Sequence, residues 1–82
     1  MTEKIDELIY NIISEKSKVP RRELAPDTEI YDSRIISSLA MLELIEHIEH
    51  RFSIVVLPEE LTEDNFRDIQ TIIDFVHQKA AA

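Results

Sequence analysis

The sequence predicts an all-α fold: a small four-helix bundle with three longer helices, one short helix and a long first loop. Three segments repeat apolar residues at steps of three and four, which is the period of a helix that buries one face. The chain has 82 residues, of which 44% are hydrophobic, so it can bury one small core. Residues 1–82 are therefore expected to form a single domain.

The first helix is expected over about Thr2 to Glu15, and a long connection follows from about Ser17 to Ser37. Pro20 and Pro26 interrupt this connection, because each lacks a backbone N–H and restricts the residue before it. Loops of this length inside compact domains are uncommon and usually functional. The apolar residues expected to face the core are Ile5, Leu8, Ile9, Ile12 and Ile13 of the helix, and Val19, Leu24, Ile30, Tyr31, Ile35 and Ile36 of the connection.

The second helix is expected over about Ser38 to Phe52. Ser37 and Ser38 stand directly before its apolar face, and serine is a favoured N-cap because its oxygen accepts a backbone N–H. A negatively charged group attached there would lie at a helix N-terminus, where the helix dipole stabilises it. With its neighbours, this helix is expected to form a core of Leu42, Ile45, Ile48, Phe52, Ile72, Val76, Ile9 and Ile12.

The segment from Phe52 to Leu57 is rich in β-branched residues and could also form a strand. No second segment of this kind is available to pair with it, so we expect a buried connector that ends at Pro58. A short helical turn is then expected around Glu63 to Phe66.

The last helix is expected over about Asp68 to Lys79, with Asp68 as its N-cap. Its inward residues should be Ile69, Ile72, Ile73 and Val76. The tail of residues 80–82 is expected to be disordered.

The chain carries a formal net charge of −8 at pH 7 and has no cysteine. Nucleic-acid binding needs lysine and arginine to displace counterions from phosphates, so this charge argues against it and favours basic partners instead. Without cysteine there is neither a disulfide nor a thiolate metal site. The longest apolar run, Ile54 to Leu57, is too short to span a bilayer, so we expect a cytoplasmic protein without a membrane partner.

Known catalytic patterns do not fit the sequence. A serine hydrolase would need a Gly-x-Ser-x-Gly elbow, and the chain contains no glycine. His47 and His50 are three residues apart, whereas a zinc-protease helix places its histidines four apart. Both histidines follow a glutamate by four residues, Glu43 and Glu46, which is the spacing of side-chain pairs on an exposed helix face. No catalytic residue and no metal site is therefore predicted.

A series of short motifs points to a known family. Ser37-Ser38-Leu39 is followed by Leu42-Glu43-Leu44, and later by Glu49-His50-Arg51-Phe52-Ser53-Ile54. This series resembles the phosphopantetheine-attachment site of acyl carrier proteins, where Asp-Ser-Leu opens the second helix and apolar-Glu-Leu and Glu-x-x-Phe-x-Ile follow. Here Ser37 stands in place of the aspartate. The segments at residues 26–36, 61–69 and 72–76 are also similar to the family, so the resemblance covers nearly the whole chain.

The resemblance implies that a phosphopantetheinyl transferase attaches 4′-phosphopantetheine to Ser38, and that the distal thiol holds an acyl or aminoacyl group as a thioester. The protein would then be a stand-alone carrier, not an enzyme, for fatty-acid, polyketide or nonribosomal peptide biosynthesis or for dedicated aminoacyl chemistry. Ser33 follows Asp32 and is the alternative serine, but Arg34 follows it instead of leucine. Ser37 can supply the cap of the missing aspartate but not its negative charge.

The family resemblance also bears on loop geometry, because family members commonly carry glycine where this chain has Arg34 and Ser53. Glycine tolerates a positive φ at no steric cost. A left-handed backbone at either position would cost about 1 kcal/mol.

Partner enzymes of the family present basic patches to the second helix, so the resemblance implies a docking surface on the exposed side of that helix. The residues expected to bind partners are Leu39, Met41, Glu43, Glu46 and Glu49. A monomer is expected. The alternative is an unmodified interaction module that keeps the carrier fold and binds a partner through its acidic second helix.

Overall fold

The computed structural model describes residues 2–32 and 36–81. This part of the chain is mainly helical and contains no β-strand, which confirms the predicted all-α fold. The elements in chain order are α1 (Thr2–Ser17), the 3-10 helix η1 (Arg21–Glu23), α2 (Ser38–Phe52), the 3-10 helix η2 (Pro58–Glu60), α3 (Glu63–Phe66) and α4 (Ile69–Ala81).

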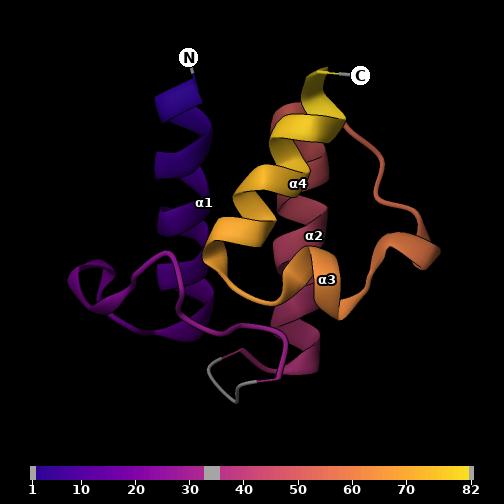
Figure 1. The fold of residues 1–82 in the computed structure, drawn as a ribbon. Helices are drawn as coiled ribbons and strands as arrows, with labels where there is room; N and C mark the ends of the chain where they lie inside the picture. Colours follow the sequence, from indigo (N-terminus) through magenta and orange to yellow (C-terminus); the bar gives the residue numbers. More distant parts are fainter. Residues whose placement is uncertain (1, 33–35, 82) are drawn as a thin grey trace.

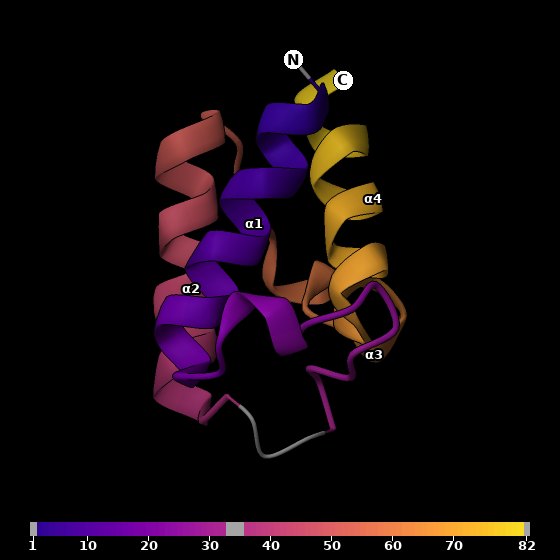
Figure 2. The same cartoon turned by 90° about the vertical axis from the view of Figure 1, so that its left-hand side faces the viewer.

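Three long helices form the bundle, and the short α3 packs against α4 (Figure 1). Helix α1 contacts both α2 and α4, and α2 and α4 also contact each other. Both chain termini lie at one end of the bundle, whereas α2 begins at the opposite end. Figure 2 shows the first connection passing from the end of α1 to the start of α4 before it turns toward α2.

The core is filled by apolar side chains from all four α-helices and from the first connection. No polar side chain is buried among the described residues. The rings of Phe66 in α3 and Phe75 in α4 lie 5.4 Å apart with an interplanar angle of 53°, a favourable tilted arrangement. The buried members are Ile9, Ile12, Ile13, Leu24, Ile30, Ile36, Leu44, Ile45, Ile48, Phe66, Ile69, Ile72, Ile73, Phe75 and Val76.

The core prediction was wrong at Leu42, whose surface is 56% exposed. Leu44 is fully buried in its place, together with Ile45 and Ile48. At 100° per residue, Leu42 lies about 110° from the centre of the face that these three residues form. The other predicted core positions in α1, α2 and α4 are buried, except that Ile5, Leu8 and Phe52 are only half-buried.

The first connection is held by its apolar residues, as predicted for Leu24, Ile30 and Ile36, which are buried, and Val19, which packs against the core. The prediction was wrong for Tyr31, which is 45% exposed. Ile35, also predicted to hold the connection, lies outside the described residues.

Backbone groups of the connection complete the start of α4. The N–H of Ile69 donates to Thr28 O at 3.3 Å, and the N–H of Gln70 donates to Pro26 O at 2.9 Å. The N–H of Thr71 donates to Asp68 Oδ1 at 2.9 Å, so Asp68 is the N-cap as predicted. These bonds satisfy donors that have no partner within the helix, and they fix the connection to α4.

Helices α1 and α4 each run two residues further than predicted. Helix α1 ends at Ser17, and the N–H of Lys18, at φ 65°, donates to Ser14 O at 2.9 Å. Helix α4 continues through Ala81, because alanine has the highest helix propensity. The disorder of the tail in solution stays a prediction.

Helix α2 has the predicted bounds, and its C-cap Ser53 is left-handed at φ 55° and ψ 47°. This conformation matches the expectation from the missing glycine, whereas Arg34 lies outside the described residues. The following segment is a connector and not a strand, as predicted. It was wrongly expected to be buried, because Val55 is 64% and Leu57 43% exposed.

Candidate functional site

The two serines at the start of α2 make different contacts. Ser37 is the N-cap, and its Oγ accepts the N–H of Ala40 at 3.1 Å. Ser38 is the first residue of the helix and is exposed. Within the described part of the chain, no hydrogen bond engages the Ser38 hydroxyl. The Ser38 hydroxyl is therefore exposed at this helix end and takes no part in the cap.

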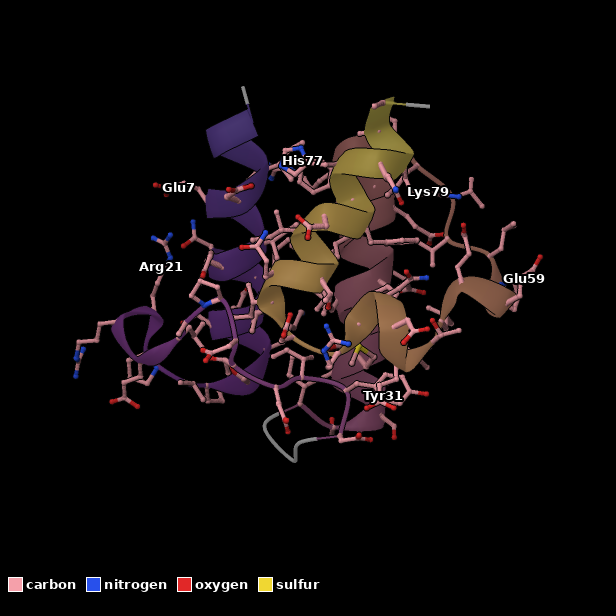
Figure 3. All side chains as sticks on the ribbon, in the orientation of Figure 1. Glu7, Arg21, Tyr31, Glu59, His77 and Lys79 are labelled. Atoms are coloured by element: carbon pink, nitrogen blue, oxygen red, sulfur yellow. The ribbon has the colours of Figure 1, made fainter. Side chains whose placement is uncertain are left out.

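A hollow of about 440 Å³ opens beside Ser38. Its wall includes Leu42 and Tyr31, the two apolar side chains that the core leaves exposed here. Tyr31 lies at the end of the bundle where α2 begins (Figure 3). The lining residues are Tyr31, Ile36, Ser37, Ser38, Met41 and Leu42.

A second, more apolar hollow of about 190 Å³ adjoins the first and reaches toward α3. The two hollows share Tyr31, Met41 and Leu42, so these side chains form the boundary between them. The second hollow is lined by Tyr31, Met41, Leu42, Ile45, Leu61 and Phe66. Together the hollows form an apolar recess that leads from Ser38 into the space between α2 and α3.

The wall that Tyr31 provides is held by the turn between α3 and α4. The N–H of Ile30 donates to Arg67 O at 2.7 Å, and the N–H of Tyr31 approaches the same oxygen at 3.4 Å. Beside it, a side-chain hydrogen bond with Asp32 and the charge of the same carboxyl raise the pKa of Glu63. Two acidic side chains, one from the connection and one from α3, therefore meet at this edge of the recess.

The residues predicted to bind partners fall into different environments. Leu39 is 68% exposed and Glu46 is also exposed. Met41 is half-buried in the wall of the recess. The Glu43 carboxylate lies 3.5 Å from Lys16 Nζ, and Glu49 Oε2 accepts the N–H of Val56 at 2.9 Å.

Leu42 and Tyr31 line both hollows, although the sequence predicted that both would face the core. The period of α2 allowed another choice, because Leu44, Ile45 and Ile48 also recur at helical spacing. A prediction that Leu44 faces the core would have placed Leu42 on the exposed side of the helix.

The three histidines do not belong to a cluster of potential metal ligands in the described residues. No group of three or more potential ligands gathers anywhere in the described residues. His77 Nε2 lies 3.0 Å from Asp6 Oδ1 and joins α4 to α1 near the termini (Figure 3).

No described helix is long and apolar enough to cross a membrane.

Comparison with known proteins shows the family of this sequence. Residues 7–76 match the family model described as phosphopantetheine attachment site. The chain is 34% identical over 80 residues to an acyl carrier protein of Chlorobium phaeobacteroides, covering 96% of this chain and 100% of that protein. It is 31% identical over 80 residues to an acyl carrier protein of Guillardia theta, covering 98% and 96% respectively.

The chain belongs to the acyl carrier protein family. It is a carrier protein with a covalently attached 4′-phosphopantetheine group. The start of α2 fits this group, because it offers an exposed serine hydroxyl beside a recess and a helix N-terminus that stabilises a phosphate. Proteins of this family interact with phosphopantetheinyl transferases and with biosynthetic enzymes.

Proposed function

We propose that this carrier holds its 4′-phosphopantetheine on Ser38 and transports acyl or aminoacyl cargo without catalysing a reaction itself. The observation that carries the proposal is the division of labour between the two serines. Ser37 uses its hydroxyl to cap α2, while Ser38 is exposed at the mouth of the recess. When bound, the arm supplies a thiol, which the cysteine-free chain lacks, and cargo is held on that thiol as a thioester.

The residues around Ser38 suit a phosphodiester at this position. The attachment oxygen belongs to the first residue of a 15-residue helix, whose N-terminal N–H groups and dipole stabilise an anion by about 0.3–1 kcal/mol. The first turn of α2 contains no acidic side chain that would repel a phosphate. Ile36, Met41 and Leu42 line the adjoining hollow with apolar surface, along which the methyl and methylene groups of the arm can lie.

We propose that partner enzymes dock on the outer side of α2, where Leu39 and Glu46 are exposed. Glu43 can take part, because a surface ion pair such as its contact with Lys16 contributes only about 0–1 kcal/mol and is easily exchanged. Met41 and Glu49 contribute indirectly, since one shapes the recess and the other holds the connector after α2.

The alternative, an unmodified interaction module, draws on one observation. Ser37 supplies the helix cap but not the negative charge of the family's aspartate. A transferase that needs this charge would bind the chain poorly, and the fold would then serve only to bind partners.

The test is intact-mass analysis after co-expression with a broad-specificity phosphopantetheinyl transferase and coenzyme A. The wild-type chain should gain the mass of one phosphopantetheine group. Ser38→Ala should abolish the gain, whereas Ser33→Ala and Ser37→Ala should each retain some labelling. Labelling that survives Ser38→Ala would contradict the assignment, and a wild-type chain that is never labelled would favour the interaction module.

A further inference from the structure

The cations of this acidic chain gather at one corner of the bundle. The formal net charge is −8, yet residues 16–22 contain four of the nine lysine and arginine residues and no acidic residue. Three of the four are exposed, and we call them the basic corner: Lys18, Arg21 and Arg22. They fall within five consecutive positions, so their Cα atoms are at most about 15 Å apart.

The basic corner lies where α1 ends and η1 begins. Figure 1 shows this junction beside α1, on the side of the bundle away from α3, and in Figure 2 it faces the viewer. In Figure 3, the labelled Arg21 lies far from the labelled Tyr31, which lines the recess beside Ser38. A short segment bound at the basic corner would therefore leave Ser38 and the recess uncovered.

The side chains of the basic corner are available to a partner. The Arg21 guanidinium lies 5.1 Å from the centre of the Tyr10 ring, a cation–π contact that supports it from below. Its ion pair with Glu7, at 3.7 Å between two exposed side chains, is of the weak surface kind. Across the described residues, no hydrogen bond or ion pair engages the side chains of Lys18 and Arg22.

The backbone of Lys18 is a second, independent observation. Its φ of 65° is left-handed, a conformation that glycine adopts at no steric cost and a residue with a Cβ atom does not. The N–H of Lys18 donates to Ser14 O at 2.9 Å, a bond that glycine would form equally well. Strained backbone at a non-glycine residue is concentrated where the side chain has a function. The lysine at this turn therefore indicates that its ammonium group is used.

The size of the basic corner selects the class of anion. Basic clusters that bind anionic membranes contain about four to eight cations, and the three residues of η1 are polar and offer no apolar side chain for insertion. Nucleic acids need a wider basic surface, and the net charge of −8 opposes their long-range attraction. A short acidic segment needs only local cations, and guanidinium groups bind carboxylates through paired hydrogen bonds.

We propose that the basic corner is a docking surface for a short acidic segment of a partner protein. Such a partner holds the carrier by the junction of α1 and η1, so that Ser38 stays accessible to other enzymes. This anchoring role goes beyond the transport of cargo and does not depend on modification of Ser38.

The test titrates a synthetic peptide of alternating glutamate and serine into the full, unmodified, isotope-labelled chain and follows the amide signals by NMR. At about 0.1 M salt the Debye length is about 10 Å, which screens the distant carboxylates of the chain but not close ion pairs. The shifts should cluster over residues 16–23. Lys18→Gln with Arg22→Gln should weaken binding roughly fivefold, because two exposed ion pairs are lost.

The matched control is Arg51→Gln with Arg67→Gln, which removes the same two charges from exposed positions elsewhere. The control should leave the affinity within about twofold of wild type, and circular dichroism should show that both double variants keep the helical fold. Absence of peptide binding, shifts centred away from residues 16–23, or equal weakening by both double variants overturns the proposal.

Two further measurements sharpen the result. Lys18→Gly should raise the melting temperature, because it relieves the left-handed backbone, and should weaken peptide binding. A glycine variant that binds the peptide as tightly as wild type would show that the lysine side chain is not used. Tighter binding to phosphatidylglycerol vesicles or to single-stranded DNA than to the peptide would overturn the assignment of an acidic protein segment.

Discussion

The two ends of α2 are built in opposite ways. At its start, one side-chain hydrogen bond from Ala40 N–H to Ser37 caps the helix, and exposed Leu39 and Leu42 border a recess. At its end, the N–H of Ile54 donates to Glu49 O at 3.2 Å. The carboxylate of the same glutamate accepts the N–H of Val56 in the following connector. One helix thus leaves apolar surface open beside Ser38, where we propose that the arm is attached, and closes its other end with bonds to the carbonyl and carboxylate of Glu49.

The largest expected effect distinguishes the buried from the open face of α2. Leu44→Ala should lower the free energy of unfolding by roughly 2–5 kcal/mol, because it leaves a cavity at a fully buried position. Leu42→Ala removes the same atoms from a mostly exposed position and should change the free energy of unfolding by less than about 0.5 kcal/mol. Urea denaturation of the two variants compares them directly, and equal losses would contradict the observed orientation of α2.

A smaller effect is expected at the closed end of the helix. Glu49→Ala should cost about 1–2 kcal/mol, because it leaves the N–H of Val56 without its acceptor. Glu49→Gln should cost less, since the amide oxygen can still accept that N–H. Glu46→Ala is the matched control on the exposed face and should leave the denaturation midpoint unchanged. If Glu46→Ala lowered stability as much as Glu49→Ala, the hydrogen bond between Glu49 and the Val56 N–H would not explain the loss.

The connector after α2 should also weaken in acid. Hydrogen bonds from the Leu57 N–H and from Lys79 hold the pKa of Glu60 below its ordinary value of 4.5. A lowered pKa contributes stability that is present above pH 4.5 and is lost as the pH falls through the folded value. Glu60→Gln should therefore be less stable than wild type at neutral pH, and the difference should shrink below pH 4.5. Thermal denaturation across pH 3–7 checks this, with Glu59→Gln as an exposed control.

The smallest change in stability is expected near the start of α2, at Glu63, and it has the opposite sign. The Asp32 carboxyl raises the pKa of Glu63, so ionised Glu63 destabilises the fold. Such a group contributes stability below its unfolded pKa, and this stability is lost as the pH rises through the folded value. Glu63→Gln should therefore raise the melting temperature slightly at neutral pH and leave it unchanged in acid. A lower melting temperature at neutral pH would show that Asp32 and Glu63 do not repel each other.

The sequence predicted the ends of elements better than their orientation. Ser37, Asp68 and Pro58 mark boundaries through local chemistry, so the bounds of α2 and α3 and the cap of α4 could be predicted. The buried face of α2 depends on where α1 and α4 lie. Leu42 and Leu44 both fit a helical period, and only this packing selects Leu44.

The site was predictable to a similar extent. The motif at Ser37-Ser38-Leu39 located the start of α2, and the structure leaves Ser38 accessible there. The recess was not predictable, because Tyr31 and Leu42 form its wall only after the connection is fixed to Arg67. The role of Glu49 was also hidden, since its acceptor bond depends on the path of the connector seven residues later.

The contact between His77 and Asp6 has a practical meaning for anyone who handles this molecule. It joins α4 to α1 at the end of the bundle where both chain termini lie, away from the start of α2 (Figures 1 and 3). Helix α2 has 15 residues, which corresponds to a length of about 22 Å between that start and its far end. A fluorescent fusion or a surface tether at either chain end would therefore leave Ser38 and the recess facing away from the support.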